Sequence, residues 1–226
     1  MKFDISKYLI LGRENTKSRT VEEVVKAAVE AGFTFIQIRS KEETALEMIE
    51  DCLKVSDLLK KMGKSDEVSV VVDDRLDVIL AAREKGAKID GIHVGQTDIP
   101  VEVCRKYLGE DSIIGLSAPT KDLISYVKNC DVKNLDYFGA GPVHETATKP
   151  DCGRDETGKV ITKPLEELAE LAKISPIPVV VGGGVKLKDI KPLRQAGVGG
   201  FFVITAITDA PDPYTAAKEL TDAWDN

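Results

Sequence analysis

Residues 179–205 read VVVGGGVKLKDIKPLRQAGVGGFFVIT and indicate the fold more strongly than any other stretch of the sequence. Two apolar runs in this stretch each end in a loop, one of three consecutive glycines and one small and hydroxylated. Glycines let backbone N–H groups come close to a phosphate, and the N-terminus of a following helix adds a favourable dipole. A (β/α)8 barrel builds a phosphate site in this way, after its seventh and eighth strands. We therefore expect six further strand–helix units upstream.

The rest of the chain contains those units in strict alternation. Strands are expected at 7–11, 33–39, 69–74, 91–95, 113–117, 137–141, 178–181 and 200–204. Helices are expected at 21–32, 42–61, 75–85, from 100 onwards, and at 121–128, 164–173, 187–195 and 213–224. The strands are apolar throughout, which indicates a parallel sheet that is covered by helices. The sequence thus predicts an α/β protein with a single TIM-barrel domain over residues 1–226.

Composition narrows the possible partners. A formal net charge of −7 and a pI of about 5.1 argue against a nucleic-acid-binding protein, which needs a basic surface. No apolar run approaches the roughly 20 residues of a membrane span. The four cysteines show no C-x-x-C spacing and no export signal precedes them, so we expect reduced thiols and a cytoplasmic location. Small-molecule ligands are therefore expected, and a homo-oligomer is possible.

Two cationic residues follow the second predicted strand. In a barrel, polar residues at the carboxyl ends of strands carry function. Gln37, Arg39 and Lys41 alternate here, so they are expected on one side of the chain. Arginine can bind a phosphate through two parallel hydrogen bonds, and lysine adds a compact positive charge, so the two side chains together suit a diphosphate. The alternative is an exposed network of ion pairs.

Carboxylates follow the third and fourth predicted strands. Asp73 and Asp74 end the third strand, and Asp98 lies just after the fourth. Carboxylate oxygens from adjacent strand ends are the ligands that Mg²⁺ takes, and Asp74 and Asp98 are the favoured pair. The alternative for either residue is capping of the helix that follows. His93 lies within an apolar strand and is interpreted as a packed core histidine rather than a group that transfers protons.

Hydroxyl groups follow the fifth and sixth predicted strands. Ser117 could contact a phosphate or cap a helix. The sixth strand leads into about twenty irregular polar residues, and a loop of that length is more often functional than idle. Thr146, Thr148 and Lys149 within it could close over an anion, although an ordinary solvated loop remains the alternative.

Taken in order, these segments resemble the thiamine phosphate synthase family over nearly the whole chain. The segments are QIRSK, VVDDR, GIHVGQTD, GLSAPT, DYFGAGPVHETATKPDCG, VVVGGGV and FFVITAI. The resemblance implies a (β/α)8 enzyme that joins 4-amino-2-methyl-5-pyrimidinylmethyl diphosphate to 4-methyl-5-(2-phosphoethyl)thiazole. The products are thiamine phosphate and pyrophosphate, and the implied cofactor is Mg²⁺.

The resemblance also implies a role for each matching residue. The pyrimidine diphosphate is held by Gln37, Arg39, Lys41, Ser117 and Lys149, and the magnesium ligands are Asp74 and Asp98. The thiazole phosphate is held by Thr146, Thr148, Gly184, Ile204 and Thr205. Arg39, Lys41 and Lys149 would stabilise the charge on the departing pyrophosphate.

Three positions depart from the pattern of the family. Asp73 replaces the usual asparagine that contacts the diphosphate, and an acid there repels a phosphate unless Arg39 or a metal offsets its charge. Pro119 stands where a histidine is common, and Thr205 replaces a serine. These departures leave room for a catalytically silent barrel that binds thiamine precursors. A thiazole tautomerase, which needs no metal, and a sugar-phosphate isomerase or aldolase are further alternatives, although neither explains the retained acids and cations together.

Overall fold

The computed structural model describes residues 3–145, 153 and 156–226, and within them eight parallel strands close into a barrel. The strands are β1 (Lys7–Leu11), β2 (Phe35–Ile38), β3 (Ser69–Asp73), β4 (Gly91–Val94), β5 (Ile113–Ser117), β6 (Tyr137–Ala140), β7 (Val179–Val181) and β8 (Gly200–Val203). Each strand pairs with its neighbour in sequence, and the pairing of β1 with β8 closes the ring. The TIM-barrel prediction is confirmed.

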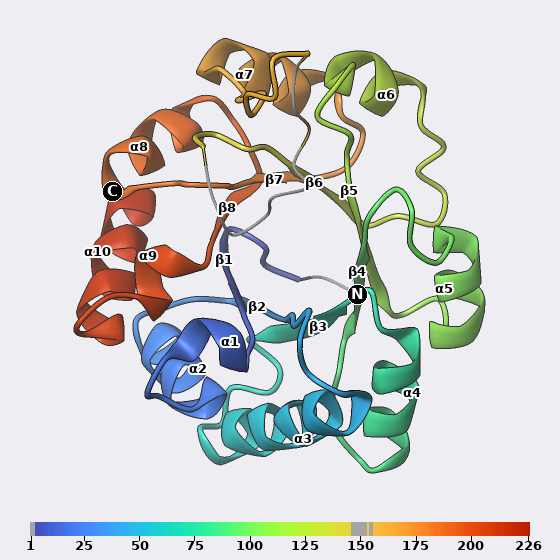
Figure 1. The fold of residues 1–226 in the computed structure, drawn as a ribbon, viewed down its shortest axis with the longest axis vertical. Coiled ribbons are helices and arrows are strands. Elements are labelled where there is room, and N and C mark those ends of the chain that lie inside the picture. Colours follow the sequence, from blue (N-terminus) through green and yellow to red (C-terminus); the bar gives the residue numbers. More distant parts are fainter. Residues whose placement is uncertain (1–2, 146–152, 154–155) are drawn as a thin grey trace.

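Helices surround this barrel on its outer side (Figure 1). They are α1 (Arg13–Thr16), α2 (Val21–Glu30), α3 (Ala45–Lys61), α4 (Leu76–Glu84), α5 (Val101–Leu108), α6 (Leu123–Asn129), α7 (Leu165–Ile174), α8 (Leu187–Gln195), α9 (Thr205–Thr208) and α10 (Pro213–Asp225). The sequence predicted all of them except α1 and α9, which are single turns too short to show a helical period. None of the helices in the described ranges has the length and apolar character needed to cross a bilayer.

Apolar side chains fill two layers, one inside the barrel and one between the strands and the helices. The inner layer includes Tyr8, Phe35 and Tyr137, whose rings meet edge to face. The outer layer is larger and takes residues from every strand, such as Leu9 next to Tyr8. Because successive residues of a strand point to opposite faces, both faces need apolar side chains. This double burial explains why the strands read as continuous apolar runs.

The residues at which α2 and α3 begin are set by capping residues that can be recognised in the sequence. Thr20 caps α2 and Thr44 caps α3, and in each helix a glutamate three residues on, Glu23 or Glu47, bonds back to the cap. This reciprocal arrangement satisfies backbone N–H groups that have no partner within the helix. The caps fix where α2 and α3 begin, and so fix the lengths of the loops that follow β1 and β2.

Candidate active site

A pocket of about 650 Å³ opens at the carboxyl ends of the strands. Every predicted site residue that the structure describes lines it: Gln37, Arg39, Lys41, Asp73, Asp74, Asp98, Ser117, Gly184, Ile204 and Thr205. The predicted residues Thr146, Thr148 and Lys149 lie outside the described part of the chain. The pocket therefore gathers residues from strand ends that are far apart in the sequence.

One side of the pocket, the acid–base rim, consists of Arg39, Lys41, Asp73, Asp74 and Asp98. Arg39 Nε lies 3.1 Å from Asp73 Oδ2, and these two side chains are only 12% and 10% exposed. Lys41 Nζ lies 2.6 Å from Asp74 Oδ2 and 3.8 Å from Asp73 Oδ2. The predicted cations thus already have carboxylate partners before any anion arrives.

The pKa values of this rim follow from burial and from neighbouring charges. Burial lowers the pKa of Lys41, but the hydrogen bond to Asp74 and the charges of Asp73 and Asp74 outweigh it and raise that pKa. Burial raises the pKa of Asp74, but hydrogen bonds with Lys41 and Asp98 outweigh it, so the net shift is downward. Burial and then the adjacent Asp74 raise the pKa of Asp98. Lys41 is therefore cationic and Asp74 anionic at neutral pH.

Asp74 has an unusual backbone at the end of β3. Its φ of +59° places it in the left-handed region, which few residues other than glycine adopt and which aspartate tolerates better than most. Neither Asp74 nor Asp98 caps the helix after it, because α4 and α5 have no side-chain cap. Asp98 Oδ2 instead accepts a hydrogen bond of 2.7 Å from the N–H of Gly95. The two carboxylates are therefore held by their own loops and turned toward each other rather than toward helix ends.

This pair of carboxylates suits a divalent cation. Asp74 and Asp98 each shift the pKa of the other, so the two carboxylates are neighbours, and two like charges so placed favour a cation between them. Across residues 3–145, 153 and 156–226, no set of three or more histidine, cysteine or acidic side chains is arranged to hold a metal. Two carboxylates with substrate phosphates completing the shell are the usual magnesium arrangement. The donor set therefore fits Mg²⁺.

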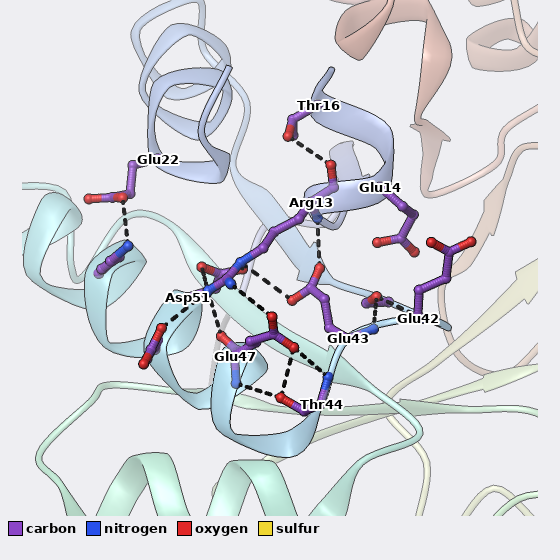
Figure 2. A network of polar contacts seen from close by, with 12 residues as sticks. Arg13, Glu14, Thr16, Glu22, Glu42, Glu43, Thr44, Glu47 and Asp51 are labelled. Carbon is purple, nitrogen blue, oxygen red and sulfur yellow. Dashed lines mark hydrogen bonds and ion pairs between the residues drawn. The ribbon is translucent and has the colours of Figure 1, made fainter. Parts of the chain in front are cut away.

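A polar network behind the rim holds the segment that carries Lys41 (Figure 2). Arg13 Nε and Nη2 each donate to Asp51 on α3 at 2.9 Å, and the backbone N–H of Arg13 donates to Glu43 at 2.7 Å. The backbone N–H of Lys41 donates to Glu14 Oε1 at 3.2 Å. Since bidentate arginine–carboxylate pairs fix direction as well as distance, the network ties the loop after β1 to the loop after β2. Sequence reasoning missed Arg13, because its acidic partners lie 30–38 residues away.

The opposite side of the pocket, the glycine rim, consists of Gly183, Gly184, Ile204 and Thr205. Gly183 and Gly184 have φ values of +83° and +69°, where a side chain is strained. A Cβ on Gly184 would lie 2.9 Å from Cβ of His144. Among the described residues, the N–H groups of Gly183 and Gly184 find no acceptor. These backbone donors therefore face the pocket as a ready cradle for an anion.

The segment after β6 packs onto this glycine rim. The backbone N–H groups of Val143 and His144 both donate to the carbonyl of Gly183, at 3.1 and 2.9 Å. The side chain of His144 reaches Asp189 on α8, with Nε2 and Oδ2 2.9 Å apart. His144 had no specific role in the sequence analysis, because its partner lies 45 residues further along the chain. The start of the long loop is therefore fixed to the phosphate cradle.

The floor of the pocket joins His93 and Ser117 to two tyrosines that sequence reasoning left out. The hydroxyls of Tyr8 and Tyr137 lie 3.0 Å apart, and Tyr137 OH lies 2.9 Å from His93 Nδ1. His93 Nε2 lies 2.9 Å from Ser117 Oγ, so Ser117 bonds to a buried histidine and caps no helix. His93 is packed as expected and is 9% exposed. The available signal was a tyrosine, with its polar hydroxyl, in each of the two largely apolar strands β1 and β6.

Comparison with known proteins identifies one family over nearly the whole chain. A family model described as thiamine monophosphate synthase matches residues 7–207. A thiamine-phosphate synthase of Corynebacterium efficiens is 36% identical over 217 residues, which cover 96% of this chain and 94% of the relative. One of Natronomonas pharaonis is 34% identical over 224 residues and covers 99% of this chain and 96% of its own.

Solved structures show the same likeness. Thiamine phosphate pyrophosphorylase from Pyrococcus furiosus superposes with a TM-score of 0.78 at 29% identity and covers 98% of this chain and 96% of its own. A 3-hexulose-6-phosphate synthase from Salmonella typhimurium reaches a TM-score of 0.69 at 16% identity and covers 97% of this chain and 98% of its own. The second likeness indicates the barrel alone, because its identity is so low.

Proposed function

The chain belongs to the thiamine monophosphate synthase family and is a thiamine-phosphate synthase enzyme, and from this premise we propose how its pocket divides the work. The acid–base rim takes 4-amino-2-methyl-5-pyrimidinylmethyl diphosphate, and the glycine rim takes the phosphate of 4-methyl-5-(2-phosphoethyl)thiazole. The two rims then present the two reacting carbon and nitrogen atoms to each other. The observation that supports this division is that one pocket has charged side chains on one wall and bare backbone donors on the other.

The two cations of the acid–base rim bind the diphosphate in different ways, Arg39 with donors that Asp73 leaves unused and Lys41 by changing its partner. Arg39 is held 3.1 Å from Asp73, and its guanidinium has further donors for a phosphate. Lys41 is 55% exposed at its side chain, so it can turn from Asp74 toward the ligand. The resemblance assigns Lys149 to the same anion.

Mg²⁺ is the cofactor that these residues would hold, through Asp74 and Asp98. When bound, the ion would offset charge on the departing pyrophosphate. Lys41 would then be released from Asp74, because the metal takes over the neutralisation of that carboxylate. Asp73 stays paired with Arg39 and adds negative charge near the ligand, which makes a cation in the site more necessary.

Bond cleavage needs no nucleophile from the protein. The aminopyrimidine ring can delocalise positive charge, so the carbon–oxygen bond to the diphosphate breaks first and leaves a short-lived pyrimidinylmethyl cation. Arg39 and Lys41 stabilise the negative charge that develops on the leaving group, and the hydroxyl of Ser117 lines the same pocket. The thiazole nitrogen then attacks the cationic carbon.

The glycine rim orients the second substrate. The N–H groups of Gly183 and Gly184, with Ile204 and Thr205 at the start of α9, bind the thiazole phosphate. Because these donors belong to the backbone of a rigid barrel, they hold the phosphate without any side-chain rearrangement. The resemblance assigns Thr146 and Thr148 to the same phosphate. Cytoplasmic location and oligomeric state stay predictions.

The test is pyrophosphate release by the purified protein with both substrates, with and without Mg²⁺, together with mass detection of the joined product. We expect product only when both substrates and the metal are present. Equal rates after removal of divalent cations with a chelator would contradict the metal assignment. Release of pyrophosphate without joined product would instead contradict the role of the glycine rim.

A further inference from the structure

An unbroken chain of hydrogen bonds crosses the floor of the pocket beneath the substrates. It runs from Gln37 Nε2 to Tyr8 OH (2.7 Å), to Tyr137 OH (3.0 Å), to His93 Nδ1 (2.9 Å), and from His93 Nε2 to Ser117 Oγ (2.9 Å). Its members come from five strands, β2, β1, β6, β4 and β5. The chain therefore connects two opposite walls of the pocket, and both of its ends line that pocket.

Most of this chain is closed off from water. Tyr8 and Tyr137 are 1% and 0% exposed, Gln37 at one end is 1% exposed, and His93 is 9% exposed. Gly115 makes room for the buried ring, because a Cβ there would lie 2.1 Å from Cζ of Tyr137. Burial raises the pKa of both tyrosines far above their ordinary value, so both hydroxyls keep their hydrogens. Each buried polar atom must then find its partner within the chain.

The direction of the hydrogen bonds follows from the first donor. An amide nitrogen can only donate, so Tyr8 OH accepts from Gln37. The hydrogen of Tyr8 then goes to Tyr137 OH, which is the acceptor that contacts it. Tyr137 OH in turn gives its own hydrogen to Nδ1 of His93. A neutral imidazole carries one N–H, so that hydrogen is on Nε2 of His93 and is donated to Ser117 Oγ.

The opposite direction fails at Tyr8. If Ser117 donated to His93 and His93 donated to Tyr137, the hydroxyl of Tyr137 would donate to Tyr8. Tyr8 OH would then receive two hydrogens, one from Gln37 and one from Tyr137, and its own hydrogen would need a further acceptor. Residues 3–145, 153 and 156–226 supply no such acceptor for it. An unsatisfied buried hydroxyl is unfavourable, so the first direction is the stable one.

We propose that Tyr137 and His93 are positioning residues that set the hydroxyl of Ser117 as a donor toward the departing pyrophosphate. Since His93 occupies a lone pair of Ser117 Oγ, the hydrogen of Ser117 must go to an acceptor other than His93. With substrate bound, that acceptor is an oxygen of the diphosphate. A donor fixed in advance at a developing negative charge lowers the barrier, whereas a lone pair pointed there would raise it. The inference rests on the proposed contact between Ser117 and the diphosphate.

The backbone of Ser117 is held as firmly as its side chain. Gln96 Nε2 donates to the carbonyl oxygen of Ser117 at 2.7 Å. Rotation of the whole residue is therefore restricted, and the hydrogen bond from His93 also restricts the orientation of its hydroxyl group.

The direction of the chain can be measured without substrate. The protein has two histidines, so ¹⁵N-labelled histidine gives two imidazole rings, and His93→Gln identifies one of them by its loss. We expect His93 in neutral form with its hydrogen on Nε2 at neutral pH. A hydrogen on Nδ1, or a doubly protonated ring, would overturn the inference whatever the enzyme catalyses.

The consequence for catalysis is tested by a double-mutant cycle of Tyr137→Phe and Ser117→Ala. Tyr137→Phe should slow pyrophosphate release about tenfold, with the KM for thiazole phosphate unchanged, because one orienting hydrogen bond is lost. The double variant should be no slower than Ser117→Ala alone, since Tyr137 acts through Ser117. Tyr107→Phe, at an exposed tyrosine of α5, is the matched control and should change neither quantity.

The outcomes separate this inference from the proposed function. Suppose that Ser117→Ala alone slows pyrophosphate release and that the double variant is slower still, by the product of the two single effects. This result would overturn the inference but leave the proposed contact between Ser117 and the diphosphate intact. Normal release in Ser117→Ala would overturn both. If Tyr137→Phe does not fold, His93→Gln and His93→Leu replace it. The glutamine amide can still donate to Ser117, so it should keep more activity than leucine, and equal losses would overturn the inference.

Discussion

In the proposed function, the two rims of the pocket bind anions by opposite means. The acid–base rim uses charged side chains that have already found partners, such as Arg39 with Asp73 and Lys41 with Asp74. The glycine rim uses backbone N–H groups, and it excludes side chains because Gly183 and Gly184 have positive φ values. In the proposed function, Lys41 of the first rim must leave Asp74 when a ligand arrives, whereas the second rim is complete beforehand.

This difference separates catalysis from binding. Charged groups that change partners can act more strongly on the transition state than on the bound substrate, and only such differential action raises kcat. A fixed cradle binds the phosphate equally throughout the reaction, and so it mainly sets KM. Changes to the acid–base rim should therefore affect kcat and metal dependence, and changes to the glycine rim should affect the affinity for thiazole phosphate.

The largest effect is expected from Asp98→Ala. Loss of one of the two carboxylates that fit the cation should lower kcat by about 10²–10³-fold, because charge on the leaving group is no longer offset. Pyrophosphate release at increasing Mg²⁺ measures this effect. Asp111→Ala, an exposed acid before β5 and away from the pocket, is the control. Full activity of Asp98→Ala at low Mg²⁺ would exclude the metal site.

Gly184→Val should come next and should affect binding instead. A side chain at φ +69° meets His144 and covers the backbone donor, so the KM for thiazole phosphate should rise about 10–100-fold with a smaller change in kcat. Steady-state kinetics with the thiazole phosphate varied provides the measurement.

Gly197→Val is the matched control for this glycine. Gly197 also has a positive φ, of +81°, but a Cβ there has nothing within 4 Å. Both variants should therefore lose stability from backbone strain, and only Gly184→Val should lose affinity for the phosphate. If Gly184→Val binds the phosphate normally and merely unfolds at a lower temperature, the glycine has only a structural role.

A smaller effect in the opposite direction is expected from Asp73→Asn. Removing the carboxylate charge beside Arg39 should lower the KM for the pyrimidine diphosphate about threefold to tenfold, because the guanidinium no longer has a competing anion. Asp77→Asn makes the same change of net charge at an exposed residue of α4 and is the control. A higher KM would show instead that Asp73 is needed to orient Arg39.

The smallest effect concerns pH. Burial and the adjacent Asp74 raise the pKa of Asp98, so protons should compete with the metal at milder acidity than at an ordinary aspartate. The Mg²⁺ concentration for half-maximal activity should therefore rise as the pH falls toward the raised pKa of Asp98. Asp98→Asn cannot be protonated at this position, so its requirement, although larger, should depend less on pH. If the Mg²⁺ requirement of the unmodified protein and that of Asp98→Asn changed equally with pH, protonation of Asp98 would not be the cause of the pH dependence.

Most of the fold could be predicted from local patterns. The glycine run at 182–184 and the apolar runs before each loop identified the barrel, and β1, β5 and α8 have the expected bounds. Local patterns suffice here because each strand–helix unit is continuous in sequence. The single turns α1 and α9 were missed, since four residues cannot display a helical period.

The sequence also predicted which residues line the pocket, but it did not predict which of their side chains bond to one another. Residues at the carboxyl ends of barrel strands must share one end of the barrel, so Arg39, Asp74 and Ser117 were expected to meet there. Which atoms pair depends on backbone details such as the positive φ of Asp74, and no motif encodes those details.

The sequence by itself determined the barrel, the two loops that we expect to form a phosphate site and the family to which the chain is similar. Only the tertiary structure decided that Arg39 is paired with Asp73 and that Tyr8, Tyr137 and His93 form one hydrogen-bonded chain. The physical reason is distance along the chain. Tyr8 and Tyr137 are 129 residues apart and meet only when the ring of strands closes around their hydroxyls.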